Sequence, residues 1–181
     1  MNAKKQLLVT VGTTEFDALI KALDCEEFWQ YTRTQMYSDI IFQIGRGVYE
    51  PVYLAGSDHD VGSGIRSRFS WFRFVPDLSS IVRECDTVIS HCGAGTILEV
   101  LESGARLIVA VNESLMDNHQ MELADALSAG FHCEVIRPTT AVRALMRADT
   151  SSSLFTLGQD RGVNPFTFAQ VLDETLGFPK C

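Results

Sequence analysis

The stretch SHCGAGTILEVLESG (90–104) holds residues that could bind an anion. Gly93, Ala94 and Gly95 carry little or no side chain, so the backbone N–H groups of this turn are open to a ligand. A helix is predicted to begin near Gly95. The first amides of a helix have no partner within it and carry a partial positive charge. The turn therefore predicts a phosphate-binding site.

Glu99 lies on the same predicted helix, where Ala94, Ile97, Leu98 and Leu101 form an apolar stripe. We expect this stripe to be the buried face, and Glu99 lies off it. The rise from Ala94 to Glu99 is about 7.5 Å, roughly the separation between a diphosphate and its ribose hydroxyls. A carboxylate there can accept hydrogen bonds from the 2′- and 3′-hydroxyls. Spacing alone does not distinguish this role from that of a solvated glutamate.

A second polar stretch, NESLMDNHQMEL (112–123), also predicts a helix start. Asp117 and Gln120 have the spacing of a capping box, which places Asn118, His119 and Gln120 in the first helical turn. Their amide and imidazole groups suit sugar hydroxyls and phosphate oxygens. The alternative is that Gln120 is only a capping partner and the other two side chains are solvated.

Two further loops follow β-rich runs. Gly12, Thr13 and Thr14 come directly after QLLVTV, in a pattern that is neither the dinucleotide fingerprint nor a P-loop. Both of those nucleotide sites are therefore disfavoured. In QIGRG (43–47), Arg46 is either a phosphate clamp or part of a surface turn.

Two other patterns are weaker candidates for chemistry. Asp58 and Asp60 have the D-x-D form of a metal-dependent sugar-nucleotide site, but they lie in a Gly/Ser loop without a firm strand before it. Cys92 has the outline of a nucleophile elbow, yet His91 replaces the small residue that this motif places before the nucleophile. We predict that Cys92 is a small, buried, unreactive thiol.

Alternating β-rich and helical segments must position these residues. Strands are predicted at 6–11, 39–44, 69–75, 87–91, 106–111 and 133–137. Helices are predicted from the first loop to about 29, and at 77–85, 95–103, 118–129, 139–147 and 166–178. This alternation predicts an α/β fold with a parallel sheet covered by helices on both faces. Such sheets bind ligands beyond the carboxyl ends of their strands, so the polar loops are expected to converge at one edge.

Composition narrows the function classes. The 181 residues are 46% hydrophobic and 21% charged, with a net charge of −8, which argues against binding to nucleic acid or anionic lipid. No apolar run reaches the roughly 18–20 residues of a membrane span, and the N-terminus lacks signal-peptide features. The five scattered cysteines favour reduced thiols in the cytoplasm. We expect residues 1–147 to form one ligand-binding domain and 148–181 a linker and terminal amphipathic helix.

Four segments together resemble one protein family: LLVTVGTTEFDALI, FQIGRG, VISHCGAGTILEVLESG and VNESLMDNHQMELADAL. They are similar, in order from about residue 6 to 130, to the donor-binding subunits of eukaryotic dolichol-pathway UDP-N-acetylglucosamine transferases, which have a glycosyltransferase family 28 C-terminal domain. The resemblance implies the Rossmann-like C-terminal half of a GT-B enzyme. A membrane-anchored subunit that binds the lipid acceptor would supply the other half and recruit this chain to the cytosolic face of the endoplasmic reticulum.

The implied reaction moves N-acetylglucosamine from UDP-N-acetylglucosamine to N-acetylglucosaminyl-diphosphodolichol, forming a β1,4 bond with inversion. The resemblance implies no cofactor and no essential metal. No catalytic residue is assigned, and the general base is expected on the partner. A donor-binding regulatory subunit without turnover is the main alternative, and a thiol hydrolase using Cys92 is a weaker one.

The resemblance also implies roles for individual residues. Gly93, Ala94 and Gly95 would face the diphosphate and, with His119, stabilise the leaving group, while Glu99 would bind the ribose. The other residues implied to bind the donor are Gly12, Thr13, Thr14, Phe74, Val75, His91, Asn118 and Gln120. Phe74 and Val75, at the end of their predicted strand, would pack against the uracil. Cys92 departs from the family, which often has alanine there, and segments 56–64 and 148–165 do not follow its pattern.

Overall fold

A parallel sheet forms the centre of the protein in a computed structural model that describes residues 4–56, 67–112 and 133–150. Within these ranges the sheet has six strands in the order β3-β2-β1-β4-β5-β6. The strands are β1 (Lys5–Thr10), β2 (Tyr37–Gln43), β3 (Arg68–Phe72), β4 (Thr87–His91), β5 (Arg106–Ala110) and β6 (Glu134–Ile136). All neighbouring pairs run parallel. The predicted α/β, Rossmann-like fold class is confirmed.

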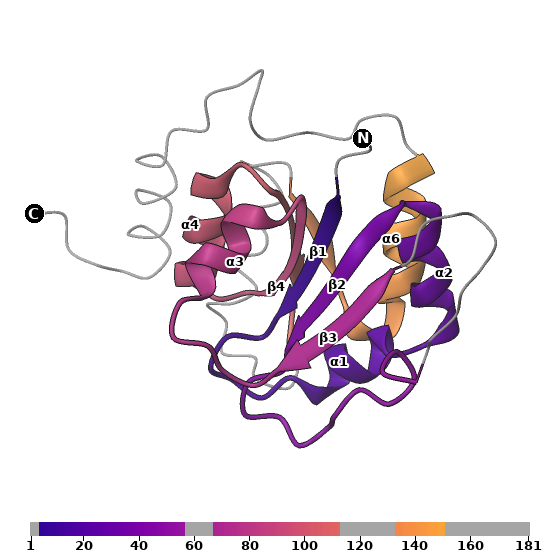
Figure 1. Ribbon diagram of the computed structural model, residues 1–181, viewed down its shortest axis with the longest axis horizontal. Coiled ribbons are helices and arrows are strands. Elements are labelled where there is room, and N and C mark those ends of the chain that lie inside the picture. The colour runs from indigo at the N-terminus through magenta and orange to yellow at the C-terminus, as the bar shows by residue number, and fades with distance from the viewer. Residues whose placement is uncertain (1–3, 57–66, 113–132, 151–181) are drawn as a thin grey trace, which may run out of the picture.

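Helices cover both faces of this sheet (Figure 1). They are α1 (Asp17–Leu23), α2 (Glu26–Thr34), α3 (Leu78–Glu84), α4 (Ala94–Ser103), the 3₁₀ helix η2 (Pro138–Thr140) and α6 (Ala141–Thr150). Helices α3 and α4 pack side by side on one face, and α6 contacts both α1 and α2 on the other. No helix in the described ranges is both long and apolar enough to cross a bilayer.

Two hydrophobic cores lie on opposite faces of the sheet. Leu7 and Val9 of β1 point into the core beneath α1, α2 and α6, whereas Leu8 points into the core beneath α3 and α4. This alternation follows from the two-residue period of a strand. Because helices cover both faces, the central strands are apolar almost throughout, as in the run QLLVTV.

The chain changes direction across the sheet between β1 and β4. From β1 the order runs outward to β2 and β3, and the chain then returns to place β4 on the other side of β1. The connections on the two sides of this point lead away from each other and leave a crevice beyond the carboxyl ends of the two strands. Gly12 follows β1 and His91 ends β4, so both lie at this crevice.

Two predicted element boundaries were wrong. The strand predicted over 69–75 ends at Phe72, where its pairing with β2 also ends at Gln43. The next carbonyl, that of Arg73, accepts a hydrogen bond from the side chain of Gln43. The helical segment predicted to reach about residue 29 is two helices that meet at Asp24 and Cys25. The Asp24 carboxylate instead accepts hydrogen bonds from backbone amides of the loop after β2.

The buried face of α4 also differs from the prediction. Ile97 and Val100 are fully buried, whereas Leu98 and Leu101 are half-buried against the same core. Ala94 is not part of this face, because the first turn of the helix borders a cavity. The helix ends at Gly104 (φ +76°), as predicted. The predicted helices at 118–129 and 166–178, and most of segments 56–64 and 148–165, lie outside the described residues.

Candidate functional site

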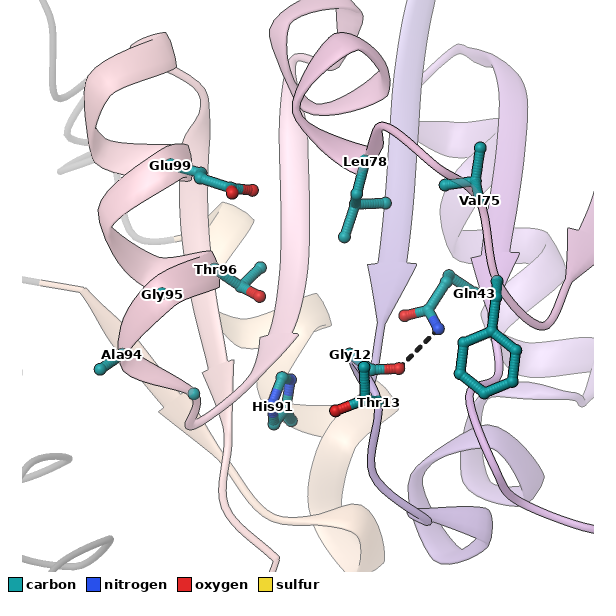
Figure 2. Close-up of a pocket in the computed structure, with 12 residues that line it drawn as sticks. Gly12, Thr13, Gln43, Val75, Leu78, His91, Ala94, Gly95, Thr96 and Glu99 are labelled. Carbon is teal, nitrogen blue, oxygen red and sulfur yellow. Dashed lines mark hydrogen bonds between the residues drawn. The ribbon is translucent and has the colours of Figure 1, made fainter.

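A cavity of about 310 Å³ lies beyond the carboxyl ends of β1 and β4. We call it the carboxyl-edge cavity. Its lining residues are Gly12, Thr13, Gln43, Phe74, Val75, Leu78, His91, Gly93, Ala94, Gly95, Thr96 and Glu99. Loops that are distant in sequence thus meet at one edge of the sheet, as the alternation of strands and helices predicts (Figure 2).

The turn between β4 and α4 forms one wall. Gly93 is extended (φ −105°, ψ 118°), and its N–H donates to the His91 carbonyl at 2.7 Å. The first hydrogen bond of the helix runs from Ile97 N to Gly93 O at 3.0 Å. The amides of Ala94 and Gly95 precede this bond, so the helix itself provides them with no acceptor. They border the cavity and carry the positive end of the helix dipole.

His91 lies at the floor of the cavity, between this wall and the turn after β1 (Figure 2). Its Nδ1 is buried and has no hydrogen-bond partner of normal geometry among the described residues. Burial lowers the pKa of His91, and the backbone carbonyl of Thr10 offsets part of that effect. Burial thus favours the neutral imidazole, whose single ring N–H can be donated either to the Thr10 carbonyl or to a ligand.

Two glycines make room for this imidazole. A Cβ added at Gly12 would lie 2.6 Å from His91 Cε1, and one at Gly93 would collide with His91 Nε2. Gly12 also has φ +60°, a conformation that side chains disfavour. The sequence pattern drew attention to both glycines as open backbone, and the structure adds that the His91 ring requires them.

Glu99 and Thr96 project from α4 toward the cavity (Figure 2). Glu99 is half-buried, whereas Glu102 on the same helix is exposed. This geometry favours the ligand-facing interpretation of Glu99 that spacing alone left open. Thr96 adds a hydroxyl one turn closer to the start of the helix.

The opposite wall comes from the segment after β3. Phe74 and Val75 line the cavity and remain 55% and 37% exposed, so both present apolar surface that a planar ring could cover. Arg73 anchors this segment from the neighbouring position, since its guanidinium forms an ion pair with Glu50 at 2.8 Å. The predicted uracil-facing pair thus lies beyond its strand, but within the cavity.

Other predicted residues lie elsewhere. Thr14 is not among the lining residues: its hydroxyl donates to the Val11 carbonyl at 2.8 Å, and its own carbonyl accepts from Arg46 N at 3.0 Å. Both residues therefore shape the turn beside the cavity. Asn118, His119 and Gln120, and the aspartates at 58 and 60, lie outside the described residues.

Three lining residues were not predicted: Gln43, Leu78 and Thr96. Gln43 is the last residue of a buried strand, where a side chain able to form several hydrogen bonds is unusual. A polar residue at the end of an otherwise apolar strand could therefore have identified Gln43 as a candidate site residue. Leu78 begins a helix and resembles any core leucine in the sequence, so no signal distinguishes it.

Cys92 is buried at 5% exposure, and burial raises the pKa of its thiol to about 11. Such a thiol is protonated at neutral pH and is a poor nucleophile. The prediction that Cys92 is buried is confirmed, and its raised pKa favours the prediction that the thiol is unreactive. Within the described ranges, no three His, Cys, Asp or Glu side chains are grouped so that they could hold a metal ion.

Comparison with known proteins agrees with this architecture. A model of the glycosyltransferase family 28 C-terminal domain matches residues 6–150. The UDP-N-acetylglucosamine transferase subunit ALG13 of Homo sapiens is 41% identical over 130 residues, covering 71% of this chain and 11% of that protein. The ALG13 subunit of Saccharomyces cerevisiae is 31% identical over 176 residues, covering 83% and 87%. The chain thus spans only a small part of the human protein but most of the yeast one.

Solved structures of ALG13 and of MurG are also similar to this chain. An NMR solution structure of ALG13 matches with a TM-score of 0.68 and 26% identity, covering 96% of this chain and 98% of that one. MurG of Acinetobacter baumannii shares the fold, with a TM-score of 0.61 at 16% identity, covering 99% of this chain but 47% of that one. The chain belongs to the glycosyltransferase family 28 C-terminal domain family and is a homologue of the UDP-N-acetylglucosamine transferase subunits named ALG13.

Proposed function

We propose that this chain is the donor-binding subunit of an inverting N-acetylglucosaminyltransferase that uses UDP-N-acetylglucosamine. The acceptor is N-acetylglucosaminyl-diphosphodolichol, and the new bond is β1,4. The observation that carries the proposal is the carboxyl-edge cavity, where the start of α4, the neutral His91 and the carboxylate of Glu99 face an apolar wall. These groups match a diphosphate, a ribose and a base.

The binding mode follows the order of these groups. The diphosphate lies against the amides of Ala94 and Gly95 and the ring N–H of His91, while Glu99 accepts from the ribose hydroxyls. The uracil packs against Phe74 and Val75. Residues Asn118, His119 and Gln120 contact the sugar and phosphates in this proposal, on the strength of the sequence resemblance alone.

The chemistry required of this chain is electrostatic. Inverting transfer breaks the bond between the anomeric carbon and the diphosphate, and negative charge grows on the leaving UDP. Amides at a helix start and an imidazole N–H, fixed before the reaction, stabilise that charge where it develops. Protein groups perform this role here, so we propose transfer without a cofactor or an essential metal.

The acceptor site and the general base belong to a membrane-anchored partner subunit in this proposal. The structural alignment with MurG covers 99% of this chain but only 47% of the MurG chain. The relatives named ALG13 are described as transferase subunits, which supports a complex in which a second chain supplies the other half. The partner would hold the complex at the cytosolic face of the endoplasmic reticulum.

The proposal is tested by combining donor titration with a transfer assay. The purified full chain is expected to bind UDP-N-acetylglucosamine and UDP in a calorimetric titration, but not NAD, and to transfer nothing alone. Transfer to the lipid-linked acceptor is expected once membranes containing the partner are added. Robust turnover by the chain alone, or the absence of donor binding, contradicts the proposal.

A regulatory subunit without turnover is the second candidate, because a fold alone does not demonstrate catalysis. It predicts donor binding, but equal transfer by the partner with a wild-type chain and with a chain that cannot bind donor. The thiol hydrolase alternative is disfavoured by the burial of Cys92 and its raised pKa of about 11.

A further inference from the structure

Gln43 has an unusual place in the carboxyl-edge cavity. Its side chain is almost completely buried, at 3% exposure, yet it lies where the two walls meet (Figure 2). The Nε2 group donates to Gly12 O at 2.6 Å and to Arg73 O at 2.6 Å. The Oε1 atom accepts from Thr10 Oγ1 at 2.6 Å. The amide orientation is fixed by chemistry, since two backbone carbonyls can only be met by an N–H₂ group.

These contacts connect two segments that no strand pairing connects at this point. Gly12 belongs to the turn that touches His91, on the diphosphate side of the cavity. Arg73 directly precedes Phe74 and Val75, on the base side. One side chain thus joins the turn after β1, which lies against His91, to the segment that carries the base-binding wall. Both segments leave the sheet at these points, because β1 ends at Thr10 and β3 ends at Phe72.

We propose that Gln43 is a positioning residue that holds the base-binding wall and the turn after β1, which supports His91, at the separation a nucleoside diphosphate sugar requires. The inference rests on the proposed function for the identity of the ligand. The connection between the walls itself does not depend on that identity. A buried amide with both N–H groups and its oxygen satisfied is rigid, and rigid support for contacting groups is what precise binding requires.

The test uses two variants of the full chain and a matched control. Gln43→Glu preserves shape and the acceptor for Thr10, but presents an oxygen to two carbonyls. Gln43→Met preserves length, removes both donors and avoids the buried charge, in case the glutamate variant does not fold. The control is Tyr37→Phe, which removes a buried hydrogen bond of 2.7 Å to Thr87 Oγ1 at the other end of the same strand.

The first readout needs no ligand. In ¹H–¹⁵N NMR spectra of the free protein, both Gln43 variants are expected to shift the amide signals of Gly12 and Thr13 together with those of Phe74 and Val75. Tyr37→Phe is expected to leave all of these signals in place. Shifts confined to one wall, or equal shifts in the control, would overturn the inference.

The second readout is affinity for UDP-N-acetylglucosamine. Each Gln43 variant is expected to bind at least about tenfold more weakly than wild type, whereas Tyr37→Phe loses thermal stability but not affinity. Wild-type affinity in a folded Gln43 variant would refute the positioning role. If the wild-type chain itself binds no donor, the proposed function fails, and the amide signals still decide whether Gln43 connects the walls.

Discussion

Two cavities among the described residues each lie beside the beginning of a ten-residue helix. The carboxyl-edge cavity borders α4, and a larger cavity of about 480 Å³ borders α6. We call the second the α6 cavity; its lining residues are Ala22, Cys25, Glu27, Pro138, Thr139, Thr140, Ala141, Val142, Arg143 and Met146. The backbone amides at the two helix starts differ, and this difference makes the carboxyl-edge cavity a candidate ligand site and the α6 cavity only a hollow in the surface.

At the start of α4 the chain arrives extended from β4, so the first amides of the helix have no acceptor within it. At the start of α6 the 3₁₀ turn η2 continues into the helix. There the N–H of Ala141 donates to Pro138 O and that of Thr140 to Arg137 O, while a proline at the first position has no N–H at all. The larger cavity therefore offers an anion little beyond Arg143. Converging backbone donors, rather than volume, distinguish the carboxyl-edge cavity.

Gly93→Ala is expected to have the largest effect on donor binding at the carboxyl-edge cavity. The new Cβ collides with His91 Nε2, so the wall at the start of α4 must move. We expect donor affinity to fall by more than about 30-fold and stability by about 1–3 kcal/mol, measured by calorimetric titration and urea unfolding. Gly95→Ala is the control for stability, because a Cβ there meets nothing within 4 Å. Thr139→Val, at the α6 cavity, should leave donor affinity unchanged. If Thr139→Val lowered donor affinity as much as Gly93→Ala, the two cavities could not be distinguished as ligand site and surface hollow.

Glu99→Ala is expected to have the next largest effect. Losing a carboxylate that accepts from ribose hydroxyls should weaken binding of UDP-N-acetylglucosamine about tenfold without changing the melting temperature. Glu102→Ala, an exposed position on the same helix, serves as the matched control. Equal affinity for both variants and wild type would remove Glu99 from the site.

A smaller effect is expected in the pH dependence of stability. Burial lowers the pKa of His91, so below the ordinary value of about 6.5 the unfolded chain binds a proton that the folded chain resists. Stability should therefore fall as the pH drops below about 6.5 and level off below the lowered folded pKa. His91→Gln should lack this contribution, as urea unfolding at pH 7.5 and 5.5 would show. Identical acid sensitivity in the two proteins would mean that His91 is readily protonated in the fold.

The smallest effect is expected for Cys92→Ala. The thiol is buried, with a pKa raised to about 11, and it does not line the carboxyl-edge cavity. Donor affinity and transfer with the partner should stay within about twofold of wild type, as a conservative change outside the site usually allows. Loss of activity in a stably folded variant would revive the nucleophile hypothesis.

The fold and all of the cavity's lining residues except Gln43, Leu78 and Thr96 could be predicted from the sequence. Strands buried on both faces are continuous apolar runs, and Gly104 ends α4 because glycine adopts positive φ easily. The sequence could not show that Gln43 donates to the Arg73 carbonyl just after β3, because the two residues are 30 positions apart. Nor could it show that Gly12 and Gly93 enclose His91, since periodicity reports a residue's own element and not the neighbour that element meets.

The central claim is that the start of α4 binds the diphosphate of the donor. A crystal structure of the full chain with UDP-N-acetylglucosamine tests it most directly. We predict phosphate oxygens within hydrogen-bonding distance of the amides of Ala94 and Gly95, with the uracil against Phe74. A donor bound in the α6 cavity beside Arg143, with the start of α4 vacant, would contradict the account.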